Sequence, residues 1–373
     1  MSMTPTVAPR AARAISPGRT RPAIGGSEHS LNATSVVSAR GLNLPSEKIS
    51  VMSSPVGSLG TPPLFAALDQ AQHVLVAGAG GGFDVYAGLP LALALAAQGK
   101  RVDLANLSFS RLDEVEEERW IGPSVVRIDA DATGQAGYFP ERTLARWLAS
   151  EGHEDDVYAI RRAGLRPVAA AYRALHERLA FDAIVLVDGG TDILMHGNES
   201  GLGTPEEDVT SLLAAAAIDV PTKLVVCVGF GIDAFHGVCD AQVLENLAEL
   251  DRAGAYLGAL SIPRDSPEGR AYLDAVAHAA LHTAQWPSIV NGQIAAALKG
   301  EFGDVHITDR ISGSELFVNP LMTILFTVLL DPLADRVQYA ADLADTDQVR
   351  EVSLVIERYR TTHPLRPRRA LPH

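Results

Sequence analysis

The sequence contains very little cysteine and no long apolar run. Cys227 and Cys239 are the only cysteines among 373 residues, which is too few for a disulfide framework or a cysteine-based zinc site. The longest apolar run, Leu321 to Leu330, is far shorter than the roughly 20 residues that a transmembrane helix needs. A secretory apolar segment after Met1 is also absent. We therefore expect a soluble, cytoplasmic protein that does not enter a membrane.

Positive charge is scarce in the middle of the chain. The formal net charge is −14, but residues 1–48 and 357–373 each carry +4, so residues 49–356 carry −22. A nucleic-acid groove needs positive charge along its length, and this acidic middle argues against one. We expect the partner to be a small polar molecule rather than nucleic acid, and the sequence leaves a homo-oligomer open.

Composition divides the chain into three parts. Residues 1–50 are rich in Pro, Ser, Arg and Ala and show no lasting apolar period, which is typical of a disordered leader. Residues 51–356 carry the pattern of a single α/β domain, and residues 357–373 form a basic C-terminal tail. Inside the domain, residues 112–178 are poor in strand patterns, so this segment is either an inserted helical cap or a continuation of the domain.

Short apolar runs alternate with helical patterns along the domain. Buried strands are predicted at residues 74–77, 101–105, 183–187, 224–228, 255–260 and 305–308. The clearest helix start has Thr204 as N-cap, Pro205 at the first helical position and Glu207 completing a capping box. Ser266 and Pro267 mark another start. This alternation predicts a Rossmann-like α/β fold, with a mostly parallel sheet and helices on both faces.

A glycine-rich run, "GAGGGFD", follows the first predicted strand. It nearly matches the dinucleotide-binding pattern G-x-G-x-x-G, but position 83 is Phe, and the second strand ends on an asparagine rather than an acidic residue. The glycines still leave backbone N–H groups open to an anion beside a helix start. The predicted cofactor-binding residues are Gly80, Gly81, Gly82, Asp84 and Asn106. NAD or a magnesium-bound nucleotide is the cofactor class that they would take; the alternative is a tight turn in which Asp84 only caps the helix.

Two acidic runs follow later strands. Asp188, Thr191 and Asp192 stand in "VDGGTD", and Asp233 and His236 stand in "VGFGIDAFH". The carboxyl ends of parallel strands meet at one edge of a sheet, so these side chains should lie close together. Carboxylates forced together acquire one raised pKa and can act as acid and base, or they can hold Mg²⁺. We predict Asp188, Asp192, Asp233 and His236 as catalytic residues and Thr191 as a cofactor-binding residue, with metal ligands left open.

Several longer motifs together resemble one protein family. They are "GAGGGFDVYAGLPLALAL", "VDGGTDILMHGNESGLGTPEED", "VGFGIDAFHGVCDAQVLENLAEL", "SIVNGQIAAALKGEFGD" and "SGSELFVNPLM". They resemble the bacterial and archaeal family called domain of unknown function 1152, over roughly residues 74–361. The resemblance implies a Rossmann-like protein of small-molecule metabolism with no assigned reaction. It places Asp84, Asp188, Asp192, Asp233 and His236 at positions of the family pattern.

These features favour an enzyme that acts on a small polar molecule by group transfer or hydrolysis, because clustered titratable groups at strand ends favour chemistry. The enzyme would use an acidic pocket at the strand ends together with the glycine-rich loop. The alternatives are a non-catalytic metabolite-binding or regulatory module and a structural subunit of a complex. Arg310, a rare cation among acidic loops, would either bind an anionic substrate group or pair with a neighbouring aspartate.

Overall fold

One sheet of nine strands runs through the described part of the chain, and its five inner strands are parallel. The computed structural model describes residues 58–153, 156–307 and 316–371. The strand order across the sheet is β3-β4-β5-β2-β1-β6-β7-β9-β8. The strands are β1 His73–Gly78, β2 Arg101–Ser108, β3 Trp120–Gly122, β4 Val125–Ile128, β5 Val157–Arg161, β6 Ala183–Asp188, β7 Thr222–Cys227, β8 Tyr256–Ser261 and β9 Ile324–Leu329. The predicted Rossmann-like, mostly parallel α/β fold is confirmed.

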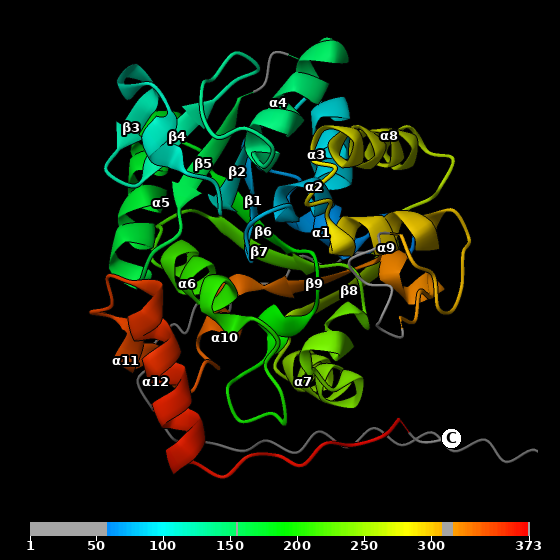
Figure 1. Ribbon diagram of the computed structural model, residues 1–373. Coiled ribbons are helices and arrows are strands. Elements are labelled where there is room, and N and C mark those ends of the chain that lie inside the picture. Colours follow the sequence, from blue (N-terminus) through cyan, green and yellow to red (C-terminus); the bar gives the residue numbers. More distant parts are fainter. Residues whose placement is uncertain (1–57, 154–155, 308–315, 372–373) are drawn as a thin grey trace, which may run out of the picture. The chain divides into compact units, whose positions relative to one another are not determined.

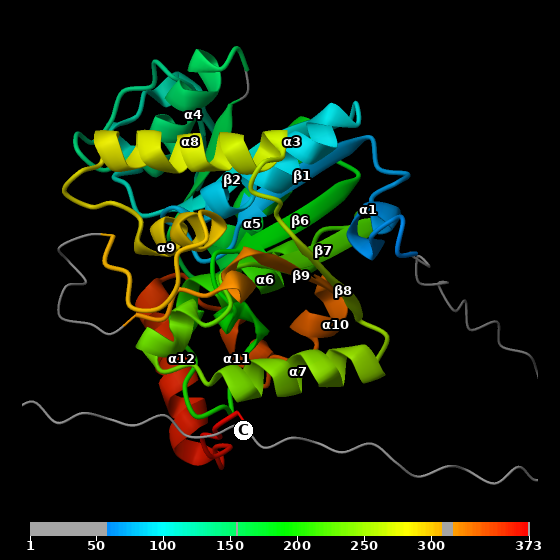
Figure 2. The same cartoon turned by 90° about the vertical axis from the view of Figure 1, so that its right-hand side faces the viewer.

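Helices cover both faces of the sheet (Figures 1 and 2). One apolar core packs against α5 Leu165–Leu179, α6 Pro205–Ala216, α7 Asp240–Arg252, α10 Leu330–Ala334, α11 Ala340–Leu343 and α12 Val349–Thr362. A second core, on the other face, packs against α1 Pro63–Ala67, α2 Asp84–Ala87, α3 Leu89–Ala97, α4 Pro140–Ser150, α8 Pro267–His282 and α9 Ile289–Leu298. Because both faces are covered, β1 and β6 are buried along their whole length. This explains why their sequences are nearly continuous apolar runs.

The strand order reverses between β1 and β6. From β1 the chain adds β2 and then β5 on one side of the sheet, and it returns to add β6 and β7 on the other side. Gly78, at the end of β1, pairs in register with Val187 of β6. In open sheets of this kind, ligands bind outside the carboxyl ends of the strands at such a reversal. The fold therefore brings the loops after β1, β6 and β7 to one edge.

The sequence pattern misses four strands, and one predicted strand is wrong. Strands β3, β4 and β5 lie within residues 112–178 and extend the sheet at one edge, so this segment supplies strands as well as the helices α4 and α5. Strand β9 lies in the apolar run near residue 325 and pairs antiparallel with both β7 and β8. Residues 305–307 form no strand, although nearby Gly303 makes an isolated bridge with Val318. Thr308 lies outside the described residues.

The predicted helix starts are partly correct. Ser266 is the N-cap of α8, and its hydroxyl oxygen accepts a 3.0 Å hydrogen bond from the Gly269 N–H. Thr204 stands at the N-cap of α6 as predicted. The capping box is wrong, because the Glu207 side chain pairs with Arg162 instead.

The basic C-terminal segment packs on the domain. Helix α12 continues to Thr362, past the expected start of the tail at residue 357. Beyond the helix, Arg366 donates to Asn246 Oδ1 at 2.8 Å and to the carboxylate of the buried Glu199. The expected leader, residues 1–50, lies outside the described residues. Within the ranges that the structure describes, no helix has both the length and the hydrophobicity to cross a membrane.

Candidate functional site

A cavity of about 730 Å³ lies at the carboxyl ends of β1, β6 and β7. Its walls include Gly80, Gly81 and Asp84 after β1, Asp188 at the end of β6 with Asp192 after it, and Asp233 and His236 after β7. The remaining walls include Ser108 and Arg111 after β2, Arg161 and Arg162 at the end of β5, and Glu207 and Asp208 at the start of α6. Loops that are far apart in the sequence therefore meet at one edge of the sheet, as the positions of the strand ends predict.

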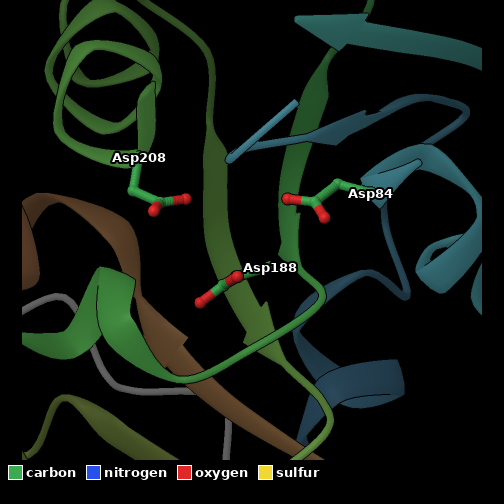
Figure 3. A group of neighbouring side chains, drawn as sticks. All are labelled: Asp84, Asp188 and Asp208. Carbon is green, nitrogen blue, oxygen red and sulfur yellow. The ribbon is translucent and has the colours of Figure 1, made fainter. Parts of the chain in front are cut away.

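Three carboxyl groups converge in this cavity (Figure 3). One oxygen of each of Asp84, Asp188 and Asp208 lies within 4.8 Å of the chosen oxygens of the other two. Asp84 is the first residue of α2, Asp188 is the last residue of β6, and Asp208 lies in the first turn of α6. Three separate elements thus direct carboxylates toward one point, at a spacing compatible with the ligands of a single cation.

The three carboxyl groups differ in the hydrogen bonds that they accept. Asp84 Oδ2 accepts a 2.7 Å bond from the Gly80 N–H, and Asp188 Oδ2 accepts a 3.3 Å bond from the Ile193 N–H. Asp208 is 2% exposed, and its Oδ1 has no hydrogen-bond partner among the described residues. A buried oxygen without a partner is unfavourable, so this oxygen is available to a ligand.

Burial and repulsion raise the pKa values of these carboxyl groups. Burial raises the pKa of Asp84 to about 7, and the charge of Asp192 contributes in the same direction. Burial raises the pKa of Asp188 and of Asp208 well above the ordinary value, and the neighbouring carboxylates raise both further. The pKa of Asp233 is raised well above its ordinary value by the same two causes. This cluster therefore requires a counter-charge, supplied either by protons or by a cation.

Asp192 and Asp233 line the cavity but also hold neighbouring backbone. Asp192 Oδ2 accepts a 2.8 Å bond from the Thr204 N–H, so Asp192 fixes the start of α6. Asp233 Oδ2 accepts a 2.6 Å bond from the Thr191 N–H. Thr191 is 1% exposed and is not part of the cavity wall. It therefore positions Asp233, and its predicted contact with a cofactor stays a prediction.

Two glycines make room for the carboxylates. A Cβ at Gly80 would lie 2.8 Å from Asp84 Oδ2 and 2.9 Å from Asp208 Oδ1. A Cβ at Gly190 would lie 2.5 Å from Asp233 Oδ2. Contacts this short would displace the carboxylates. A residue without a Cβ is therefore needed at positions 80 and 190.

The glycine-rich loop uses backbone N–H groups within the protein. The Gly80 N–H donates to Asp84, and the Gly82 N–H donates to Leu107 O at 3.0 Å. Gly82 lines a neighbouring cavity rather than the one with the three carboxylates. The loop therefore offers an anion fewer open donors than its sequence suggests. Asp84 bonds back to Gly80 within the turn and does not cap α2, whose N-cap is Phe83.

Asn106 supports the glycine-rich loop from within the protein. Its side chain is fully buried, and its amide donates to Gly82 O at 2.8 Å and to Glu141 Oε1 at 2.7 Å. It is not part of the cavity wall. Asn106 thus positions the loop, and its predicted contact with a cofactor stays a prediction. Burial also raises the pKa of its partner Glu141 to about 7.

Sequence reasoning missed several residues of the cavity wall. Asp208 follows the N-cap of α6 and reads as an ordinary acidic first turn, yet it shares the buried face with Ser211, Leu212 and Ala215. An aspartate on an apolar helix face is the signal that was available. Arg161 and Arg162 follow a strand that the pattern missed.

The structure describes His236 but not Arg310. His236 is exposed and lies at the mouth of the cavity, where it also contributes to the wall of the neighbouring one. Arg310 lies outside the described residues, so its predicted interaction with a substrate anion stays a prediction.

Comparison with known proteins identifies the family. No curated protein matches the sequence. Residues 75–363 match the family described as protein of unknown function (DUF1152). This range covers most of the chain and includes every loop that lines the cavity, in agreement with the resemblance of the sequence motifs. The chain belongs to the DUF1152 family.

Proposed function

We propose that the cavity is the active site of an enzyme that transfers or hydrolyses a group on a small polar molecule, with a divalent cation bound by Asp84, Asp188 and Asp208. The observation that carries the proposal is the convergence of these three carboxylates within 4.8 Å. The buried Asp208 Oδ1 without a partner among the described residues supports it independently. Carboxylate oxygens are the ligands that Mg²⁺ and Mn²⁺ prefer.

The charge balance of the cavity supports a bound cation. Its acidic wall residues are Asp84, Asp113, Asp188, Asp192, Glu207, Asp208 and Asp233, against three arginines, Arg111, Arg161 and Arg162. All three arginines are paired: Arg161 with Asp113 at 2.6 Å, Arg162 with Glu207, and Arg111 with Glu114 at 3.4 Å. A divalent cation would neutralise the excess negative charge and favour the ionised form of the carboxylates that bind it.

The remaining groups fit the roles that such a reaction needs. A cation polarises a phosphoryl or carbonyl oxygen, or lowers the pKa of a bound water molecule. Asp233 and His236 line the same cavity and are candidates for proton transfer. Arg161 and Arg162 also lie in the wall, where an anionic portion of the substrate would compete with Asp113 and Glu207 for their guanidinium groups.

Calorimetric titration of the full chain with Mn²⁺ tests the cation site. The wild-type protein should bind Mn²⁺, and Asp208→Asn should weaken binding by about tenfold or more, because a buried ligand oxygen is lost. Asp113→Asn is the matched control, since it removes one negative charge from the cavity wall outside the three carboxylates. Equal weakening by the two substitutions, or none by Asp208→Asn, would contradict the proposed site.

A second measurement separates an enzyme from a metabolite-binding module. Metabolite pools that include phosphate esters, Mg²⁺-nucleotides and NAD are incubated with the protein and analysed by mass spectrometry. A compound that is consumed with Mg²⁺ and spared by EDTA supports the enzyme. A compound that binds the protein and is recovered unchanged supports the non-catalytic alternative.

A further inference from the structure

A second cavity of about 640 Å³ adjoins the first. Gly81, Asp84, Phe109, His236 and Val290 belong to the walls of both, so the two are neighbouring chambers of one site. We call the cavity with the three carboxylates the acidic chamber. The second cavity is the aromatic chamber, after the rings of Phe83, Phe109, Tyr138, Phe235 and Trp286 in its wall.

The walls of the aromatic chamber are chemically unlike those of the acidic chamber. Five aromatic rings and aliphatic side chains such as Ile289 make up most of the wall. Among its wall residues Asp84 is the one carboxylate, and it belongs to both chambers. Walls of this kind favour an apolar group, because burying such a group removes its surface from water.

Part of the aromatic wall is held in place by hydrogen bonds and ring packing. Asn291, in the first turn of α9, donates from its side chain to Phe83 O at 3.0 Å. Its backbone N–H donates to Ser288 Oγ at 3.0 Å. The Phe83 ring meets the Tyr138 ring edge-on, with centroids 5.7 Å apart. This wall is therefore formed before a ligand arrives, which lowers the entropy loss on binding.

The rim of the aromatic chamber leaves apolar surface exposed to water. Phe235 is 60% exposed and Trp286 is 52% exposed. Exposed aromatic surface gathered around a cavity is typical of a binding site. An apolar group seated in this chamber would cover part of both rings.

We propose that the substrate is a phosphate ester whose alcohol portion is apolar and about the size of an aromatic ring system. This proposal rests on the proposed function, because it places the phosphate on the cation in the acidic chamber. Asp84 joins the two chambers, so a phosphate held at the cation directs the ester's apolar portion into the aromatic chamber. Phosphate oxygens bind Mg²⁺ and Mn²⁺ well, and arginine side chains recognise phosphate by paired hydrogen bonds.

Calorimetry of the full chain saturated with Mn²⁺ tests the proposal, with three probes: inorganic phosphate, methyl phosphate and 1-naphthyl phosphate. The wild-type protein should bind 1-naphthyl phosphate about tenfold or more tightly than methyl phosphate, because the naphthyl group is removed from water. The double variant Phe235→Ala/Trp286→Ala should lose most of this preference and keep its affinity for Mn²⁺ and inorganic phosphate. Phe302→Ala is the matched control, since Phe302 is 67% exposed and lies outside both chamber walls.

The outcomes separate this inference from the proposed function. If the wild-type protein binds Mn²⁺ and inorganic phosphate but does not prefer 1-naphthyl phosphate, the substrate class is wrong and the cation site stands. A preference that survives in the double variant, or that is lost equally in Phe302→Ala, also overturns the substrate class. Failure of the wild-type protein to bind Mn²⁺ overturns the proposed function itself.

Discussion

The Gly80 N–H donates a 2.7 Å hydrogen bond to the carboxylate of Asp84. Both residues belong to the turn after β1, so this bond closes the turn on itself. A Cβ at position 80 would lie 2.8 Å from this carboxylate and 2.9 Å from the carboxylate of Asp208. The glycine-rich turn thus shapes a space for carboxylates.

Gly80→Ala should disturb the cation site more than the fold. The φ angle of Gly80 is not in the left-handed region, so the backbone accepts alanine, but the added Cβ displaces the Asp84 and Asp208 carboxylates. We expect the Mn²⁺ affinity to fall by about tenfold or more with an unchanged far-ultraviolet circular dichroism spectrum. Gly60→Ala is the control, since its nearest atom would be Ser58 Oγ at 3.8 Å. Wild-type affinity in Gly80→Ala would contradict this role of the glycine.

Asp208→Asn should stabilise the protein when no cation is present. Burial and the nearby acids Asp192, Asp188 and Asp84 raise the pKa of Asp208 well above its ordinary value. Keeping Asp208 in the fold therefore costs free energy at pH 8, where the unfolded chain has lost this proton. In EDTA at that pH we expect the variant to melt about 2 °C or more above the wild type. Added Mg²⁺ should raise the melting temperature of the wild type more than that of the variant, because only the wild type keeps the complete site. An Asp208→Asn variant that melts lower in EDTA, or that gains equally from Mg²⁺, is the contrary result.

Glu141→Gln should change the pH dependence of stability. Burial raises the pKa of Glu141 to about 7 from an ordinary value of 4.5, so its proton stays bound in the fold at pH values where the unfolded chain has lost it. The stability from this group is therefore fully present below the ordinary value and is lost as the pH rises through about 7. Glutamine is neutral throughout, so the variant should gain on the wild type between pH 5 and pH 8, by up to about 3 kcal/mol.

Urea unfolding at a series of pH values measures the effect of Glu141→Gln. Glu151→Gln, at an exposed position at the end of the same helix α4, is the matched control and should show no comparable trend. A constant difference between Glu141→Gln and the wild type across this range would show that Glu141 is ionised in the fold.

Arg366→Ala should destabilise the domain although Arg366 lies in the C-terminal segment. Its side chain bonds to the carboxylate of Glu199, which is 0% exposed, and to Asn246 Oδ1 at 2.8 Å. Removing one partner of a buried ion pair leaves an incompletely compensated charge, so we expect a loss of about 2–3 kcal/mol in the free energy of unfolding. Arg368→Ala should change this free energy by less than about 0.5 kcal/mol, since Arg368 makes one long bond, 3.4 Å to Gly237 O. Equal effects of the two substitutions in urea unfolding would show that Arg366 adds nothing specific.

The strands that the sequence predicts correctly are those that carry their own local signal. Strands β1 and β6 are buried on both faces and read as apolar runs with a turn after each. Strand β9 is equally apolar, but its place in the sheet depends on antiparallel pairing with β7 and β8. Pairing between segments far apart in the chain leaves no periodic trace in either segment, so β9 was missed. Strands β3, β4 and β5 were missed because they have only three, four and five residues.

The candidate site was predictable where a residue lies at the end of a recognised strand or in the loop after it. Asp84, Asp188, Asp192 and Asp233 line the cavity for this reason. Strand-end reasoning fixes the position of a residue but not the direction of its side chain, and Asn106 is therefore in the expected place yet buried behind the loop. Asp208 was not predicted because it was interpreted as part of an ordinary acidic first turn of α6. Arg161 and Arg162 were not predicted because strand β5 was missed.

The cation site is tested most directly by anomalous diffraction from a crystal of the wild-type protein grown with Mn²⁺. We expect one strong anomalous peak between the carboxylates of Asp84, Asp188 and Asp208, and the loss of that peak in Asp208→Asn. A fully occupied Mn²⁺ elsewhere in the molecule with none among these three side chains, or the same peak unchanged in Asp208→Asn, would contradict it.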